Sequence, residues 1–149
     1  MTQVHMTAGV TTGDRFTTVQ YPDDTIHLRV TDGGNVQVIE YISSDREGPP
    51  PHSHQWDEIE FVIEGEVEFY VNGVWTQGGP GTVQMLPAGS VHSVRVPSGT
   101  ARLLYVTIGP PYDVMARELA ALYATGNADG SGIIEIAYRH GLRLEGDSA

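Results

Sequence analysis

The sequence contains no cysteine and no lysine. Without cysteine the chain cannot form a disulfide, a thiolate nucleophile or a zinc-thiolate site. All eight basic residues are arginines, so Schiff-base chemistry and a lysine general base are also excluded. The 19 acidic residues give a formal net charge of -11, and no arginine cluster offsets it locally, which disfavours nucleic acid and anionic lipid as partners. We therefore expect the partner to be a small-molecule substrate or a second copy of the chain.

Long hydrophobic runs are also missing. No stretch approaches the ~18 apolar residues that a membrane-spanning helix needs. The opening stretch MTQVHMTAGVTTGD has neither the basic region nor the apolar region of a secretory signal, so we expect a cytoplasmic protein without membrane association. The length of 149 residues suits one domain that buries roughly two thirds of its unfolded surface.

Between residues 16 and 108 the sequence alternates short β-prone runs with turn signals. The runs are RFTTVQY, TIHLRV, NVQVIEYI, IEFVIEGEVEFYV, TVQMLP, HSVRV and ARLLYVTI, all rich in β-branched and aromatic residues. Asn72-Gly73 is the strongest hairpin signal among the turns between them. This spacing predicts an all-β sandwich or barrel of about eight strands.

The period of the apolar residues changes after the two prolines that follow the last β-prone run. YDVMARELAALYATG carries an apolar stripe with helical spacing, on which lie Val114, Leu119 and Leu122. GIIEIAYRHG predicts a second short helix. We therefore divide the chain into a β-barrel domain with the N-terminal strands, residues 1–110, and a helical appendage with a tail, residues 111–149. The appendage either covers an open end of the barrel or packs on its outside.

The stretch GPPPHSHQWDEIEFVIEG places two histidines, one residue apart, in front of three acids. Side chains at positions i and i+2 of a strand share a face, so His52 and His54 can direct both imidazoles at one point. Asp57 allows a turn, after which Glu58 opens the next strand facing the same way. Two neutral nitrogens and one carboxylate suit Fe, Mn, Co, Ni or Zn better than Ca or Mg. The best candidate for a fourth ligand is His92, in GTVQMLPAGSVHSVRV.

These two stretches resemble the two sequence motifs of the cupin superfamily. HSHQWDEIEFVIEG matches His-x-His-x3-Glu-x6-Gly, and GTVQMLPAGSVH matches Gly-x5-Pro-x-Gly-x2-His. The spacer of 15 residues between them is similar to that of small bacterial single-domain cupins, and IIEIAYRHGLRLEG is similar to the C-terminal segment of quercetin-dioxygenase-like cupins. Two departures from the pattern, the position of Gly48 and Val96 in place of a frequent asparagine, touch no metal ligand.

The resemblance implies a double-stranded β-helix, the cupin jelly roll, with one or two short C-terminal helices and usually a homodimer. It also implies that His52, His54, Glu58 and His92 hold one divalent transition metal ion (Fe, Mn, Ni, Co or Zn) inside the barrel. In the family, one or two coordination positions stay open for water, substrate or dioxygen. Because an open position is what metal catalysis requires, we expect an enzyme.

A second carboxylate is predicted beside the ligands. Counting by two from Glu58 places Glu60 on the same face, where many cupins carry an aromatic or aliphatic residue. Burial near apolar walls would raise the pKa of Glu60 and allow it to act as a general acid or base. Two alternatives are that a strand bulge turns Glu60 to solvent, or that an arginine such as Arg102 pairs with it. An apolar face on the other side of this strand would suit packing against a second subunit.

The aromatic residues Trp56 and Tyr41 are candidates for substrate binding at the pocket mouth, or else core or interface anchors. The leading hypothesis is a quercetinase-like dioxygenase of a small aromatic or enolisable substrate, such as a flavonol or another polyphenol. In it, Glu58 or Glu60 accepts the proton of a substrate hydroxyl. The runner-up is a non-redox cyclase, isomerase, decarboxylase or lyase that uses Glu60 as acid or base, similar to polyketide cyclases of this family. A non-catalytic cupin that binds a small ligand is the third hypothesis.

Overall fold

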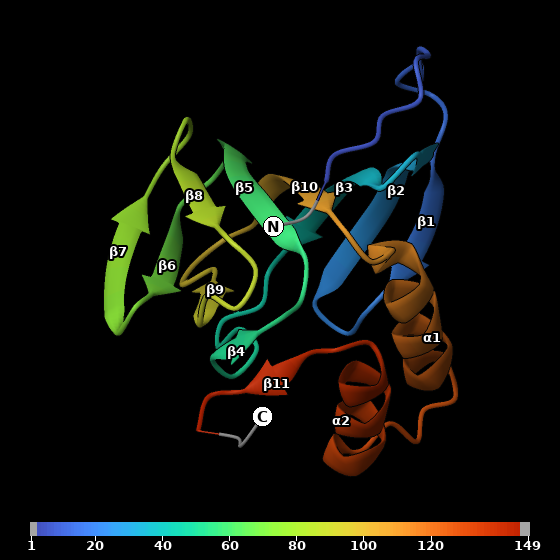
Figure 1. Ribbon diagram of the computed structural model, residues 1–149. Coiled ribbons are helices and arrows are strands. Elements are labelled where there is room, and N and C mark those ends of the chain that lie inside the picture. Colours follow the sequence, from blue (N-terminus) through green and yellow to red (C-terminus); the bar gives the residue numbers. More distant parts are fainter. Residues whose placement is uncertain (1–2, 147–149) are drawn as a thin grey trace.

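The computed structural model describes residues 3–146. Its strands and helices are β1 (Thr17–Gln20), β2 (Asp24–Gly33), β3 (Val36–Ser43), β4 (His52–Ser53), β5 (Asp57–Glu64), β6 (Val67–Val71), β7 (Val74–Gly78), β8 (Val83–Leu86), β9 (His92–Arg95), β10 (Ala101–Ile108), α1 (Tyr112–Ala124), α2 (Gly130–Arg139) and β11 (Arg143–Leu144). One sheet has the strand order β1-β2-β3-β10-β5-β8 and the other β11-β4-β9-β6-β7. The two antiparallel sheets, with two helices after the last long strand (Figure 1), confirm the predicted all-β jelly roll with short C-terminal helices.

A two-residue turn at Asn72 and Gly73 joins β6 to β7 and confirms the strongest hairpin signal. Both residues have positive φ angles, 51° and 83°, as a tight hairpin of the preferred twist requires. The run at residues 59–71, in contrast, divides into β5 and β6 instead of forming one strand. Gly65 lies at the division with a φ of 86°, and a Cβ there would lie 2.6 Å from the Thr100 carbonyl oxygen, so only glycine fits.

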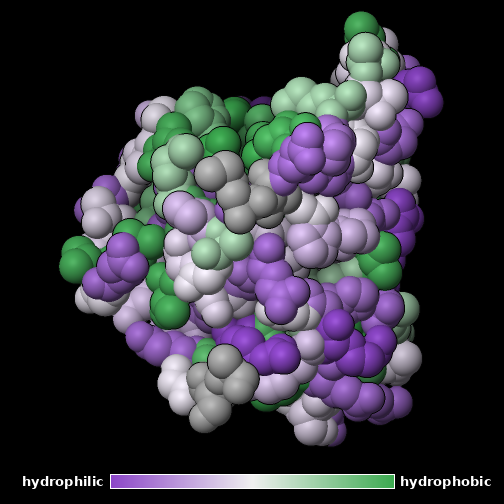
Figure 2. All heavy atoms as spheres, viewed as in Figure 1, coloured by the Kyte–Doolittle hydropathy of each residue, from purple (hydrophilic) through white to green (hydrophobic). Residues whose placement is uncertain are grey.

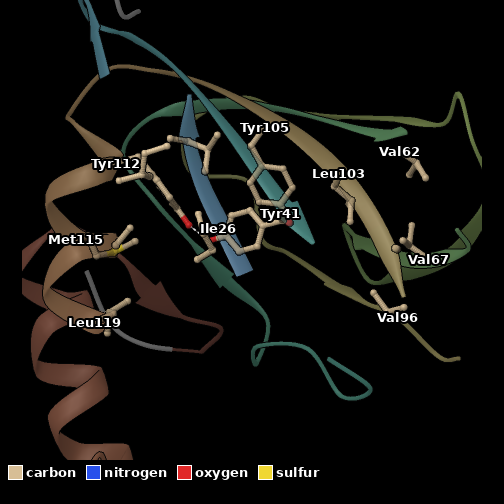
Figure 3. Close-up of a cluster of buried hydrophobic side chains, with 14 of the residues drawn as sticks. Ile26, Tyr41, Val62, Val67, Val96, Leu103, Tyr105, Tyr112, Met115 and Leu119 are labelled. Atoms are coloured by element: carbon tan, nitrogen blue, oxygen red, sulfur yellow. Dashed lines mark hydrogen bonds between the residues drawn. The ribbon is translucent and has the colours of Figure 1, made fainter. Parts of the chain in front are cut away.

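The hydrophobic core fills the space between the sheets and continues beneath α1 (Figure 3). The strands contribute buried side chains that include Ile26, Ile39, Val62, Val67, Val96 and Leu103. From α1 come Tyr112, Met115 and Leu119, which share one face because they are spaced by three and four residues. A fully buried side chain of this size contributes about 1.5–3 kcal/mol relative to an exposed one, so this face holds α1 on the barrel.

The two helices close one end of the barrel. α1 starts directly after Pro111 and contacts β1 and α2, and Gly126 follows its end with a φ of 75°. Asp129 caps α2 by accepting a hydrogen bond from the Gly132 amide at 2.8 Å. Both helices line the interior cavity, so the structure shows the first of the two arrangements that the sequence left open. Within residues 3–146 no helix is long and apolar enough to cross a membrane.

The short strand β11 is an element that the sequence does not predict. It pairs with β4, so that Leu144 lies opposite His52, and the Glu145 amide donates to the Pro51 carbonyl at 2.8 Å. Two residues are too few to show a strand period. The pairing nevertheless matters, because it brings the segment after α2 to the strand that carries the first histidine of the candidate metal site.

A buried carboxylate stabilises the outer face of the six-stranded sheet. Glu40 on β3 is only 3% exposed, and its Oε1 accepts from Arg29 Nη2 at 2.7 Å and lies 3.0 Å from His27 Nδ1. Arg102 Nε donates to the other carboxylate oxygen. Although burial opposes ionisation, hydrogen bonds from Arg102, Arg29 and His27 together lower the pKa of Glu40 to about 2.

We expect Glu40→Gln to destabilise the fold by about 2 kcal/mol near neutral pH. The folded pKa of Glu40 lies below its ordinary value of 4.5, so the charge stabilises the folded state above about pH 4.5 and this contribution disappears as the pH falls through about 2. Urea unfolding of wild type and variant at about pH 7 and about pH 3 should give a difference at the lower pH of less than half the neutral value. Glu64→Gln, which removes a 71% exposed partner of Arg102, is the matched control and should change little. A difference between wild type and Glu40→Gln that does not change with pH would contradict this account.

Candidate metal centre

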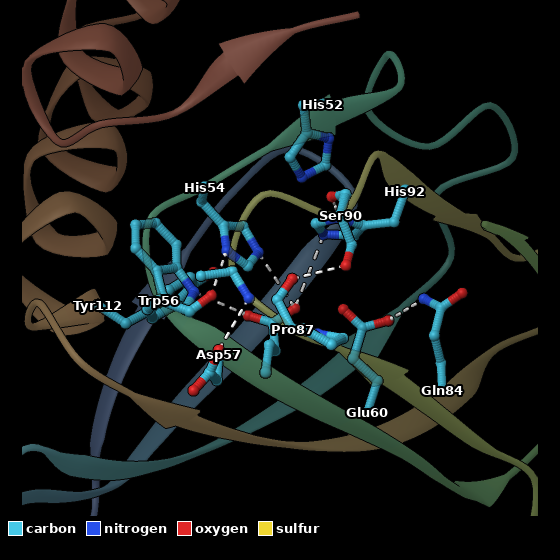
Figure 4. Close-up of polar contacts among 12 residues, drawn as sticks. His52, His54, Trp56, Asp57, Glu60, Gln84, Pro87, Ser90, His92 and Tyr112 are labelled. Atoms are coloured by element: carbon cyan, nitrogen blue, oxygen red, sulfur yellow. Dashed lines mark hydrogen bonds and ion pairs between the residues drawn. The ribbon is translucent and has the colours of Figure 1, made fainter. Parts of the chain in front are cut away.

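The candidate ligands come from both sheets, and Figure 4 shows the three histidines, His52, His54 and His92, close to one another. In the five-stranded sheet, β4 and β9 pair so that His52 lies opposite His92. Glu58 is the second residue of β5, in the other sheet, and His54 lies in the short connection between β4 and β5. The two sequence motifs therefore converge because strand pairing within one sheet and packing between the sheets bring them together.

Three of the four predicted ligands form a compact buried group. The Nε2 atoms of His54 and His92 lie 3.7 and 3.9 Å from Glu58 Oε2, and the ligand atoms of all three residues lie within 4.8 Å of one another. Each of the three side chains is buried. Two imidazole nitrogens and one carboxylate oxygen at this separation surround a point that a transition metal ion can occupy.

The histidines are oriented by the protein backbone. The Nδ1 atoms of His52, His54 and His92 lie 2.8, 3.0 and 2.9 Å from the carbonyl oxygens of Pro50, Trp56 and Ser90, respectively. A carbonyl oxygen can only accept, so each Nδ1 carries the proton and each Nε2 keeps its lone pair free for a metal. His54 Nε2 is buried and has no hydrogen-bond partner among the described residues. A buried nitrogen without a partner is costly, so this donor set fits a bound metal ion.

His52 lies beside this group but outside it. Its ring centroid is 4.5 Å from that of His92 and 6.1 Å from that of His54, and its nitrogen is not among the ligand atoms that lie close together. It is also more exposed than the other two histidines. The structure therefore brings His54, Glu58 and His92 together and places His52 at their edge, on the side of β11.

Burial favours the neutral form of His92 and His52. It lowers the pKa of His92 to about 4, and it lowers the pKa of His52 as well. Metal ligation requires a neutral imidazole, so these two histidines do not have to lose a proton before binding at neutral pH. Glu58 complements them: although burial opposes ionisation, its hydrogen bond with Glu60 and the neighbouring His54 and His92 lower the pKa of its carboxyl group.

Glu60 points into the interior, next to Glu58. It is 2% exposed, and its Oε1 accepts a hydrogen bond from Gln84 Nε2 at 2.8 Å. Burial, followed by the charge of Glu58, raises the pKa of Glu60, so the pKa values of the two neighbouring carboxyl groups are shifted in opposite directions. Figure 4 shows Gln84 reaching Glu60 from β8, the strand that pairs with β5.

Neither alternative for Glu60 describes the structure. A bulge does occur in β5, but it lies at Ile63, since Arg102 pairs with Glu64 and Leu103 with Val62. It therefore comes after Glu60 and turns only the end of the strand outward. Arg102 is engaged by two other acids, Glu40 and Glu64, on the outer face of the sheet.

Trp56 and Tyr41 are both buried and both line the interior cavity. The Trp56 indole stacks on His54 at 4.1 Å between centroids, and its Nε1 donates to Glu58 Oε1 at 3.1 Å. These contacts hold two candidate metal ligands in place. The Tyr41 ring stacks on Tyr105, and its hydroxyl hydrogen-bonds to that of Tyr112. Trp56 thus lies at the candidate metal site instead of at the mouth, and Tyr41 lies in the cavity wall.

The cavity has a volume of about 500 Å³ and runs from the metal ligands to the two helices. Several residues in or next to the cavity wall are not among the predicted site residues. Gln84 had a usable signal, because it shares a strand face with buried Leu86. Tyr105 had one as well, because it lies two residues after Leu103 in a β-prone run and so shares its strand face. Tyr112 had none, because its position depends on how α1 docks on the barrel.

Comparison with known proteins agrees with this geometry. Residues 39–108, which contain all four predicted ligands, match the family model described as the cupin domain, so this part of the chain is a cupin domain. No curated protein sequence is significantly similar to it.

Solved structures with the same fold include KdgF from Halomonas sp., with 16% identity over 72% of this chain and 99% of that one, and a TM-score of 0.63. The polyketide cyclase RemF from Streptomyces resistomycificus has 24% identity over 72% of this chain and 79% of that one, with a TM-score of 0.55. The DMSP lyase DddQ from Ruegeria pomeroyi DSS-3 has 24% identity over 58% of this chain and 47% of that one, with a TM-score of 0.52. At these identities the likeness shows the shared fold alone. The polyketide cyclase and the DMSP lyase differ in function, so the fold does not select a reaction.

Proposed function

We propose that this cupin is a metal-dependent enzyme that catalyses a non-redox proton-transfer reaction on a small aromatic or enolisable molecule, as a cyclase, isomerase, decarboxylase or lyase. One observation carries the proposal: Glu60 is a second carboxyl group, buried beside the candidate ligands and facing the same cavity. A buried carboxyl group without a cationic partner is costly, and its position in a substrate-sized cavity suits a general acid or base.

The residues around the cavity divide the chemistry between them. A divalent metal ion held by His54, Glu58 and His92, with His52 beside them, would supply Lewis-acid polarisation of a carbonyl or hydroxyl oxygen. Gln84 fixes one carboxyl oxygen of Glu60, and the hydrogen bond to Glu58 holds the carboxyl group at the candidate ligands, where it can give a proton to a bound molecule or take one from it. The apolar walls exclude water and strengthen these electrostatic interactions.

Two further points bear on the choice of reaction. The solved structures that share the fold include a polyketide cyclase and a DMSP lyase, so the fold accommodates both classes. The quercetinase-like dioxygenase that leads on sequence grounds becomes the second candidate. It is favoured by the imidazole and carboxylate ligands, which also suit redox-active metals, and by the aromatic walls of the cavity.

Assays with and without dioxygen separate these candidates. The purified protein, its metal content measured, is incubated with flavonols, other polyphenols and enolisable ketones in air and in anaerobic buffer. We expect product to form at the same rate in both. Turnover that consumes one dioxygen per product would replace the proposal with the dioxygenase, and binding without turnover in either buffer would replace it with a ligand-binding cupin.

We also propose that the active form is a homodimer, joined through the outer face of β5 and β8. Ile59 pairs with Met85 and Phe61 with Val83, and Met85 and Val83 are 63% and 45% exposed. Figure 2 shows hydrophobic residues gathered over β5, β8 and β10, at the upper left of the view. None of these four residues is charged, so two copies with a net charge of -11 each can meet there about a twofold axis without opposing like charges.

Light scattering should therefore give the mass of a dimer at micromolar concentration. Introducing a charge with Met85→Glu should shift the mass to that of a monomer without loss of the far-UV circular dichroism spectrum, because a carboxylate would be buried at the interface. Val74→Glu, at a 61% exposed position on the other sheet, should leave the dimer intact. A wild-type protein that is strictly monomeric contradicts the proposal.

A further inference from the structure

The wall of the cavity carries acids and no cationic side chain. Among the described residues that line it there is no arginine, and the sequence has no lysine. Besides Glu58 and Glu60, the lining includes three aspartates, Asp23, Asp24 and Asp45. An anionic ligand group would meet only negative charge anywhere except at a bound metal ion.

The three aspartates lie at the opposite end of β10 from the metal ligands. Glu58 pairs with Thr107 near the C-terminal end of β10. Asp24 pairs with Ser43, which in turn pairs with Ala101, the first residue of the same strand. The cavity thus has two distinct polar ends, separated by the length of a strand and joined by apolar and aromatic walls.

Asp24 is a carboxylate without a counterion. It is only partly exposed and forms no ion pair with any residue between 3 and 146, while the charged groups that act on it, Asp45 and Asp23, are also negative. Burial, and then repulsion by Asp45 and Asp23, raises the pKa of Asp24 to about 6, although Ser43 opposes the shift. A positive charge placed here would relieve this repulsion.

Tyrosine side chains surround the same end of the cavity. The hydroxyl of Tyr21 is buried and lies next to the hydroxyls of Tyr41 and Tyr112. Its ring lies 5.2 Å from that of Tyr123, at an angle of 50°. Tyr41 and Tyr112, joined through their hydroxyl groups, continue the aromatic wall towards the metal ligands. Aromatic faces beside a carboxylate are the surroundings in which proteins bind alkylammonium groups.

We propose that this end of the cavity is a cation subsite, where an alkylammonium or other onium group lies against Tyr21 and Tyr123 beside Asp24. The inference deepens the proposed function, and rests on it only in placing the other end of the same molecule at Glu60 and the metal ligands. The substrate class then narrows to small molecules that carry a positive charge at one end and a metal-binding oxygen at the other.

The test compares three ligands of one shape and different charge. Choline, its neutral carbon isostere dimethylbutanol and the matching anion dimethylbutanoate are titrated into the full-length protein by calorimetry at about pH 8, where Asp24 is ionised. We expect choline to bind at least about fivefold more tightly than the alcohol, and the anion to bind most weakly. The proposal fails if the alcohol binds as tightly as choline, if the anion binds more tightly, or if no member of the series binds at millimolar concentration.

Variants and metal removal locate the effect. Asp24→Asn should remove most of choline's advantage and leave the affinity for the alcohol within about twofold, whereas Asp32→Asn removes an exposed charge from the same strand and should change neither. An Asp24→Asn protein that keeps the full preference overturns the assignment; if this variant does not fold, the wild-type series decides alone. Treatment with a chelator should leave the preference for choline intact. Failure of the cation subsite is thereby distinguishable from failure of the metal-dependent function.

Discussion

Replacing His92 with alanine is expected to abolish metal binding and to lower thermal stability. The side chain is fully buried, and its Nε2 is one of three ligand atoms that lie within 4.8 Å of one another. Loss of a residue that only hydrogen-bonds to a metal ligand usually weakens metal binding by ~10- to 100-fold. Removing one of the three close ligands themselves should weaken it by more. Metal content measured by mass spectrometry should fall from about one ion per chain to almost none.

The stability change follows from the same binding equilibrium. A metal ion that binds only the folded state stabilises that state by about 4 kcal/mol when its free concentration is about 1,000 times its dissociation constant. A chelator should therefore lower the melting temperature of the wild-type protein and leave that of His92→Ala unchanged, which separates loss of the metal from loss of packing. His5→Ala, at an exposed position outside the cavity, should behave as the wild type does. Full metal occupancy in His92→Ala would refute the ligand assignment.

The part of the site that could be predicted from the sequence depends on local geometry. Alternation along a strand determines which residues share a face, so Glu58 predicts the inward position of Glu60 without knowledge of any distant contact. The short connection between β4 and β5 limits how far apart His54 and Glu58 can lie. The position of His92 beside these two residues followed only from the family resemblance, because no rule of local spacing predicts that β9 pairs with β4.

The part that could not be predicted depends on tertiary docking. α1 has an apolar stripe that would suit either the end of the barrel or its outer wall, and only its position on the barrel places Tyr112 beside Tyr41. The places of Asp24 and Tyr21 in the cavity could not be predicted either. Nothing in the adjacent sequence indicates that they share a cavity with Tyr123. Most of the strands and both helices were predictable, but not the cavity that they form together.

Glu60→Gln is expected to keep the metal and lose most of the catalytic turnover. The amide matches the carboxyl group in shape, so it should remain in place beside Gln84 and leave Glu58 free to bind the ion. It cannot give or take a proton, and removal of a general acid or base typically lowers kcat by about 10²- to 10⁴-fold. The measurement is kcat and KM with a substrate found in the aerobic and anaerobic assays, together with metal content.

The matched controls are two other glutamates of the same strand. Glu64→Gln changes an exposed carboxylate and should leave metal content and kcat unchanged, whereas Glu58→Gln should lose the metal. Retained metal with lost kcat and little change in KM is the pattern that distinguishes a proton-transfer group from a ligand or a packing residue, because substrate binding does not require the proton to move. Unchanged kcat in Glu60→Gln would remove the observation that places non-redox chemistry ahead of the dioxygenase, since no other carboxyl group among the described residues shares the buried position next to Glu58.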